Sequence, residues 1–169
     1  GYAPSSDSRY NEIHAVGNKI HFGGDGFSRS FNNFNQNIPN TIFIFAHGSP
    51  DVIQYGPQND PDWIRKNSLY KFDEILSKNS PLWRNRTQYP SCGQNLLTVV
   101  LVSCDTGNNR GNSYFSPIAQ ELSKTYSNIL FIAPNAEVFH GNGITKIADP
   151  YDLSKVGQWI FFMNGEIVK

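Results

Sequence analysis

One histidine and one cysteine each stand at the end of a long apolar run. His47 follows the sequence TIFIFA at residues 41–46, and Cys104 follows LLTVVLVS at residues 96–103. A thiolate attacks carbonyl carbon, and a nearby imidazole can take the thiol proton or stabilise the ionised sulfur. The pair therefore predicts nucleophilic acyl chemistry, provided that the fold brings the two residues together.

Glycines follow both candidate residues. Gly48 comes directly after the histidine, and Gly107 comes three residues after the cysteine. A tetrahedral intermediate needs N–H groups that are preorganised toward its oxyanion. The predicted donors are the backbone amides of Gly48 and Cys104, while Gly107 should allow a tight turn that brings the following loop close to substrate.

Two aspartates flank the predicted site and are candidates for contacting substrate. Asp51 lies four residues after the histidine, and Asp105 directly follows the cysteine. Either carboxylate could receive a basic side chain, which would favour cleavage after Lys or Arg. Both residues could equally cap turns, so the two interpretations stay open at this point.

Other readings of these residues remain open. A cysteine that closes an apolar strand is often a small buried hydrophobe. His140, in the sequence FHGNG, is an alternative partner for the thiol, whereas His14 and His21 lie in an early hairpin. Cys92 lies in the turn-rich sequence YPSCGQ, and a disulfide with Cys104 would need that loop to fold back.

Several other kinds of site are disfavoured by the motifs that the chain lacks. It contains no C-x-x-C or H-x-x-x-H pair for zinc and no G-x-S-x-G for a serine nucleophile. The glycine-rich sequence GGDGFS neither follows a strong strand nor opens a helix, so it is a weak phosphate-binding motif. We therefore expect no metal and no cofactor.

Size and charge point to one soluble domain, and the acyl chemistry predicted for Cys104 would act on a protein or peptide substrate. The chain has 169 residues, and its 14 basic and 14 acidic side chains cancel. No Lys or Arg run could track a phosphate backbone or an anionic lipid surface, so neither nucleic acid nor membrane is an expected partner. No segment approaches the roughly 20 apolar residues that span a bilayer, and the polar start GYAPSSDSRYNEIH lacks the features of a signal peptide.

The elements that must position the pair follow a strand, helix, strand, helix, strand order. The two apolar runs show no alternation of polar and apolar residues, which is typical of strands covered on both faces of a parallel sheet. The remaining predicted elements are a hairpin within 12–22 around Gly17-Asn18, a long loop up to residue 40, a small hairpin or excursion within 51–63, a helix over 68–78 with Ser68 as N-cap, a helix after the cap Ser116 and the first-turn Pro117, a strand over 128–134, and a hairpin around Asn164-Gly165.

This order predicts an α/β layer sandwich with right-handed crossover connections. In such sheets functional residues gather beyond the carboxyl ends of the parallel strands. His47 and Cys104 are both placed there by the pattern. We therefore expect two core strands to deliver the imidazole and the thiol to the same edge of the sheet.

The order of these motifs resembles that of the caspase-like (clan CD) cysteine peptidases. An apolar block ends in His-Gly, a helix follows, and a second apolar block ends in Ser-Cys after an interval of 57 residues (104 minus 47). Caspases have an interval of about 50. AHGS and SCDTG are most similar to the legumain, gingipain and CHAT pattern, and they depart from the caspase Q-A-C-[RQG]-G signature, so cleavage after aspartate is not implied. The resemblance covers roughly residues 40–135.

The resemblance implies a fold and a role for each matching residue. The expected fold is a caspase-like three-layer sandwich with a mainly parallel central sheet and a terminal β-hairpin. A single peptidase domain would span 1–169, with a polar lead and hairpin in 1–40, the catalytic core in 41–135 and the C-terminal hairpin in 136–169. His47 would be the general base or acid, Cys104 the nucleophile, and Gly48 and Cys104 the oxyanion donors. Ser103 matches the small residue before the nucleophile and is, with Asp51 and Asp105, a candidate for contacting substrate.

The reaction implied by the resemblance is thiol-dependent proteolysis through a thioester acyl-enzyme. The chain would be an endopeptidase or a protease that processes its own chain. A fainter similarity to toxin-associated peptidase domains implies secretion, or delivery to a target cell as part of a larger bacterial protein. Two alternatives stay open: another cysteine-dependent acyl transfer, such as deamidation or transpeptidation, and a non-catalytic interaction domain with the same fold.

Overall fold

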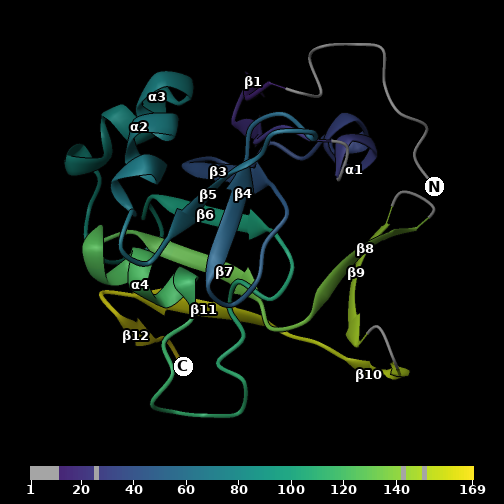
Figure 1. Ribbon diagram of the computed structural model, residues 1–169. Coiled ribbons are helices and arrows are strands. Elements are labelled where there is room, and N and C mark those ends of the chain that lie inside the picture. Colours follow the sequence, from purple (N-terminus) through teal and green to yellow (C-terminus); the bar gives the residue numbers. More distant parts are fainter. Residues whose placement is uncertain (1–11, 25–26, 142–143, 150–151) are drawn as a thin grey trace.

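The main feature of the computed structural model is a mixed β-sheet (Figure 1). The structure describes residues 12–24, 27–141, 144–149 and 152–169. Within this part of the chain the sheet has seven strands, and its four neighbouring strands from β2 to β7 run parallel. In the order in which they lie side by side, the strands are β1 (His14–Val16), β2 (Lys19–His21), β3 (Thr41–Phe45), β6 (Thr98–Val102), β7 (Leu130–Pro134), β11 (Trp159–Met163) and β12 (Glu166–Ile167).

The predicted α/β class with a mainly parallel core is confirmed. Both predicted two-residue turns are present: β1 pairs antiparallel with β2, and β11 pairs antiparallel with β12. Asn164 and Gly165 have φ angles of 52° and 83°, which is the conformation that joins hairpin strands with the correct twist. All five residues of β3 are buried, as expected of a strand that is covered on both faces.

Two apolar cores cover the two faces of the sheet. Ile42, Ile44 and Ala46 belong to the larger core, whereas Phe43 and Phe45 belong to a smaller one, because successive side chains of a strand point to opposite faces. The larger core packs against three helices, and the smaller core packs against α1. The helices are α1 (Ser28–Asn33), α2 (Tyr70–Asn79), α3 (Pro81–Arg84) and α4 (Ile118–Thr125), and a short 3₁₀ helix η2 covers Arg86–Gln88. No helix of the described residues is long and apolar enough to cross a membrane.

The two predicted serine caps are wrong. Helix α2 begins at Tyr70 after Leu69, because the Ser68 hydroxyl instead accepts a hydrogen bond of 2.9 Å from the Arg65 N–H. Helix α4 begins after Pro117 with no side-chain cap, since backbone carbonyls of neighbouring loops accept its first N–H groups. These carbonyls belong to Pro50, 2.8 Å from the Ile118 nitrogen, and Thr106, 3.1 Å from the Ala119 nitrogen.

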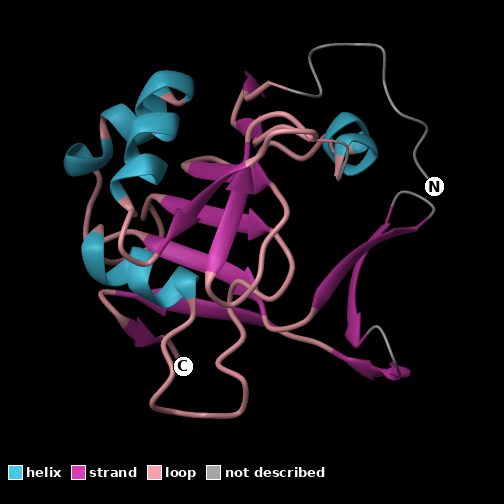
Figure 2. Ribbon diagram, viewed as in Figure 1, coloured by secondary structure: helices cyan, strands magenta, loops and turns pink. Residues whose placement is uncertain are grey.

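Three segments differ from the predicted elements or extend them. The predicted loop that precedes β3 contains α1, and the predicted excursion after His47 is an antiparallel hairpin of β4 (Val52–Tyr55) and β5 (Asp62–Arg65). The C-terminal region holds more than a hairpin, because a separate three-stranded antiparallel sheet precedes it (Figure 2). Its strands are β8 (Glu137–Gly141), β9 (Ile144–Asp149) and β10 (Asp152–Val156).

Candidate active site

His47 and Cys104 lie at the same level of two neighbouring parallel strands. Phe45 of β3 is the register partner of Val102 of β6, and the candidate residues each follow two positions later. Partner side chains on parallel strands point to the same face. The contacts agree, because Cys104 packs against the smaller core and the ring of His47 lies 5.5 Å from the ring of Phe27, which packs against that core too. The imidazole and the thiol thus share one edge and one face of the sheet.

The thiol of Cys104 is partly buried beneath β8. The N–H of Val138 donates a hydrogen bond to its sulfur at 3.3 Å, and the carbonyl of Val138 lies 3.9 Å from the same sulfur. Burial is the main cause of a raised pKa for the Cys104 thiol, and the negative charges of Glu137 and Asp105 raise it further. The Val138 N–H lowers the pKa but does not reverse the shift. The resting thiol is therefore protonated at neutral pH, and a reaction that uses its sulfur needs a base.

The peptide N–H of Gly48 is directed away from the neighbouring hairpin. Gly48 forms an isolated antiparallel bridge with Ile53, flanked by hydrogen bonds of 3.0 and 2.9 Å that the N–H groups of Ser49 and Gln54 donate. In this kind of pair the central residue points its own N–H and C=O away from the partner strand. The bridge thus leaves the N–H of Gly48 available to an oxyanion on the side where β6 ends.

Close packing explains the two glycines of the site. A side chain at Gly48 would place its Cβ 2.3 Å from the Ser103 hydroxyl oxygen, and a Cβ at Gly107 would lie 2.6 Å from the carbonyl oxygen of Ala133. Neither glycine has a left-handed backbone. The tight turn predicted at Gly107 instead has its left-handed residue at Asp105, with a φ of 59°. Gly107 serves the approach of the loop to β7, where its N–H donates to the Pro134 carbonyl at 2.8 Å.

Ser103 does not line the site. Its side chain is fully buried and packs against Gly48, on the face of the sheet opposite to Cys104. Its hydroxyl oxygen has no hydrogen-bond partner among the described residues. Ser103 was predicted as a substrate contact, but here it is the small residue that allows Gly48 to approach β6.

The two aspartates have different surroundings. The carboxylate of Asp105 accepts a hydrogen bond of 3.0 Å from the Asn108 amide, and its backbone N–H donates to the Ala136 carbonyl at 3.0 Å. These contacts belong to the turn that follows β6. The carboxylate of Asp51 instead binds two cations, Arg110 at 2.7 Å and Lys66 at 3.5 Å. The structure thus supports the turn interpretation for Asp105 and an ionic role for Asp51.

The alternative cysteine and histidine residues are placed elsewhere. Cys92 and Cys104 are both free, and Cys92 is exposed, so the disulfide considered above is absent. His21 is fully buried in the early hairpin, where its Nδ1 accepts a hydrogen bond from the Gly23 N–H at 3.1 Å. His140 lies in β8 by its backbone, and its side chain falls outside the described part of the chain. The described residues contain no group of three or more potential metal ligands.

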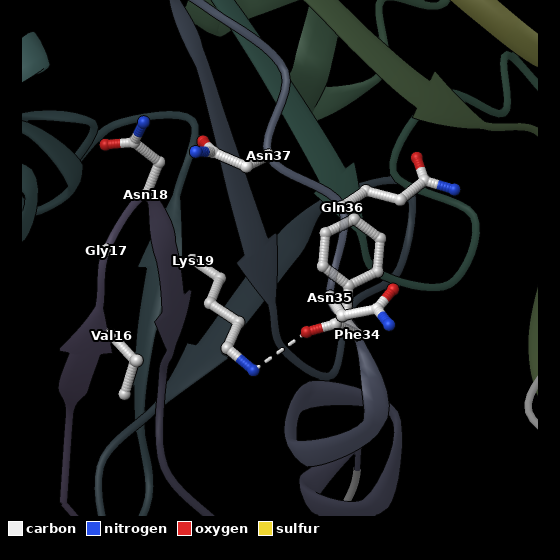
Figure 3. Close-up of a pocket in the computed structure, with 8 residues that line it drawn as sticks. All are labelled: Val16, Gly17, Asn18, Lys19, Phe34, Asn35, Gln36 and Asn37. Carbon is white, nitrogen blue, oxygen red and sulfur yellow. Dashed lines mark hydrogen bonds between the residues drawn. The ribbon is translucent and has the colours of Figure 1, made fainter.

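A polar pocket at the other end of the sheet is a weaker candidate (Figure 3). It has a volume of about 280 Å³ and includes four side-chain carboxamides, and Lys19 is its charged residue. The ammonium group of Lys19 is already bound by carbonyl oxygens at the end of α1, at 3.0 Å for Phe34. Lys19 is the first residue of β2, and Gly17 and Asn18 of the lining directly precede it, so the pocket lies at the amino end of this parallel strand. Its lysine therefore positions α1.

Some contacts of the site had no signal in the sequence. Val138 and Phe27 contact the candidate cysteine and histidine from segments that are 34 and 20 residues away in the chain. Neither segment has a motif that would reveal this contact.

The chain matches no protein-family model, no curated protein and no solved structure in the comparisons.

Proposed function

We propose that this chain is a cysteine endopeptidase of the caspase-like (clan CD) type, or a protease that processes its own chain. Cys104 is the nucleophile and His47 is the general base and acid. The observation that carries the proposal is the register of β3 and β6, which puts both residues on one face at one edge of the sheet. The proposed fold is the caspase-like three-layer sandwich, in keeping with helices that pack on both faces.

The raised pKa of the Cys104 thiol favours a mechanism in which the proton leaves during attack. His47 takes the thiol proton while the sulfur forms a bond to the scissile carbonyl carbon. The tetrahedral intermediate then collapses, the C–N bond breaks, and the imidazolium gives its proton to the leaving amine. Water attacks the remaining thioester with His47 again as base, which releases the carboxylic acid and restores the thiol.

The oxyanion of each tetrahedral intermediate would be held by two backbone amides. The N–H of Gly48 is unused by the hairpin that follows β3, and its Cα lies directly beside the end of β6. The N–H of Cys104 is the second donor. Removal of one such donor in other enzymes costs a factor of about 10² to 10³ in turnover. Gly48 therefore contributes both the donor and the close approach that a larger residue would prevent.

A peptide library tests the proposal. Wild type, Cys104→Ala, His47→Ala and Cys92→Ala are incubated with diverse peptides, and products are identified by mass spectrometry. We expect cleavage by wild type and Cys92→Ala, and none by the two dyad variants. Cleavage that survives Cys104→Ala would contradict the assignment. A small mass gain of intact peptides would instead indicate deamidation, joined peptides would indicate transpeptidation, and no reaction by folded wild type would favour an interaction domain.

A further inference from the structure

The glycine-rich loop between β2 and α1 runs beside the end of β3. The N–H of Phe22 donates to the Phe45 carbonyl at 3.0 Å, so the contact between β2 and β3 continues past the last residue of β2. The next residue, Gly23, donates its N–H to Nδ1 of His21 at 3.1 Å. His21 is the register partner of Phe45, so the sequence GGDGFS, which has no role in the proposed chemistry, begins level with His47.

This loop ends at Phe27, whose ring contacts the imidazole of His47. The two ring centres are 5.5 Å apart, and the ring planes are inclined by 54°. In the sheet β3 lies between β2 and β6, so Phe27 approaches His47 from the segment that follows β2, whereas Cys104 lies on the β6 side. Phe27 and Cys104 pack against the same smaller core. His47 thus has an aromatic ring from one neighbouring segment and the thiol from the other.

The backbone of Phe27 has a conformation that aromatic residues rarely adopt. Its φ is 64° and its ψ is 3°, which is the left-handed region and is unfavourable for a bulky side chain. Of the six non-glycine residues with a positive φ in the described part of the chain, four are Asn or Asp, which tolerate this region. Glycine, which occurs three times in GGDGFS, would fit here without strain. Such an outlier indicates that the side chain itself has a task.

Helix α1 holds Phe27 in place. The carbonyl of Phe27 accepts the N–H of Phe31 at 2.7 Å, which is the first hydrogen bond of the helix. Phe31 is buried in the smaller core, and its ring lies 5.7 Å from that of Phe45. At the other end of the helix the ammonium of Lys19 binds the carbonyl oxygen of Phe34 at 3.0 Å. Contacts along α1 thus fix the residue that precedes it.

On the basis of the proposed peptidase function, we propose that Phe27 is a positioning residue for His47. Its ring restricts rotation of the imidazole and holds it toward the thiol of Cys104. The imidazole can take the thiol proton during attack only from hydrogen-bond distance, so a freely rotating ring would be a poorer base. Phe27 acts through His47 and takes no part in the bond changes.

The kinetics of variants without the ring separate positioning from packing. Phe27→Ala and Phe27→Gly both remove the ring, but glycine adopts the left-handed backbone freely, so Phe27→Gly should be the more stable of the two in urea. Both should lower kcat for a cleaved library peptide by the same factor, on the order of tenfold, because the base is misplaced. KM should change little, since the substrate still binds. Phe27→Tyr keeps the ring and should retain the wild-type kcat.

Phe34 provides the matched control. It lies at the other end of α1 and packs against the same core, but its ring lies 4.5 Å from that of Phe43, in the middle of β3. Phe34→Ala should lower the free energy of unfolding and leave kcat unchanged. Circular dichroism verifies that each variant is folded. A kcat that falls in step with stability across Phe27→Gly, Phe27→Ala and Phe34→Ala would mean that Phe27 only packs, and would overturn the proposal.

An NMR measurement tests the position of His47 without catalysis. Nuclear Overhauser effects are recorded between the imidazole protons of His47 and the β protons of Cys104, with His47→Gln to identify the signals. We expect them in wild type and Phe34→Ala, and much weaker ones in Phe27→Ala and Phe27→Gly. This pattern without any peptide cleavage would support the positioning role and contradict the peptidase proposal. No such effect in wild type, or equal effects in the variants without the ring, would overturn the positioning role and leave the peptidase proposal to the library experiment.

Discussion

The two cysteines of the chain illustrate how environment decides the chemistry of one residue type. Cys92 is exposed in a loop, whereas Cys104 is partly buried at the end of β6 with the Val138 N–H on its sulfur. The pKa of the Cys104 thiol is raised chiefly because burial disfavours the thiolate. A resting ion pair of thiolate and imidazolium is therefore not expected here.

This shift predicts how alkylation of Cys104 depends on pH. Since the pKa is raised, the thiolate fraction at neutral pH is smaller than that of a cysteine in the unfolded chain, and it grows only at higher pH. The iodoacetamide rate at Cys104, measured by peptide mapping between pH 6 and 10, should rise later than the rate of the same residue in urea. Cys92 serves as internal standard for the reagent. A fast rate at Cys104 near pH 6 would contradict this account.

At the scale of single residues, the sequence predicted that His47 and Cys104 lie at the ends of neighbouring parallel strands. Both follow long apolar runs, and a parallel sheet collects the ends of such runs at one edge. The roles of Ser103 and Asp51 could not be predicted in this way. Which face a residue occupies at the exit of a strand, and which distant arginine reaches a carboxylate, depend on tertiary contacts.

At the scale of secondary-structure elements, the ends of β3 and β6 approach each other closely because Gly48 has no side chain. Gly48→Ala would bring a methyl group to 2.3 Å from the Ser103 hydroxyl and 2.7 Å from the Thr106 methyl. We expect a loss of about 1–3 kcal/mol in the free energy of unfolding, measured with urea. Adding Ser103→Ala and Thr106→Ser removes both obstructing atoms and should restore part of this loss.

Gly107→Ala should also lower the free energy of unfolding, but no second substitution should restore it. The obstructing atom there is the backbone oxygen of Ala133 at 2.6 Å, which no side-chain truncation removes. Full stability of Gly48→Ala without the compensating changes would mean that the two strand ends are farther apart than described.

Elements with strong local signals were predicted, and elements that depend on tertiary contacts were not. The apolar runs and the turn dipeptides Gly17-Asn18 and Asn164-Gly165 determine their strands and hairpins locally. Helix α1 is six residues long and is held by Lys19, which donates to its terminal carbonyls. The strands β8–β10 have mixed composition, so no periodic pattern predicted them. The first N–H groups of α4 donate to loop carbonyls instead of a side-chain cap, so the sequence did not indicate how this helix begins.

At the scale of the whole molecule, the larger core depends on one buried tryptophan. Trp83 of α3 is fully buried, its ring lies 5.5 Å from that of Phe72 and 5.1 Å from that of Tyr126, and its indole N–H donates to Asp73 at 2.8 Å. It joins α2, α3 and the end of α4 above one face of the sheet. Its loss should therefore affect the entire fold.

Trp83→Ala should lower the free energy of unfolding by about 3–5 kcal/mol, because it removes a large buried side chain and leaves a cavity. Trp83→Phe keeps an aromatic ring but leaves the Asp73 carboxylate without the indole donor, and should cost less. Urea unfolding followed by circular dichroism measures both. Equal, small effects of the two substitutions would show that this region contributes little to the cooperative fold.

Detection of the acyl-enzyme tests the shared position of Cys104 and His47 most directly. A cleaved peptide from the library is mixed with protein, the reaction is quenched with acid, and the protein is mapped by mass spectrometry. The account predicts a thioester of the acyl fragment on Cys104 of wild type, removed by hydroxylamine and missing from His47→Ala. Cleavage with no thioester on Cys104, or undiminished acylation in His47→Ala, would contradict it.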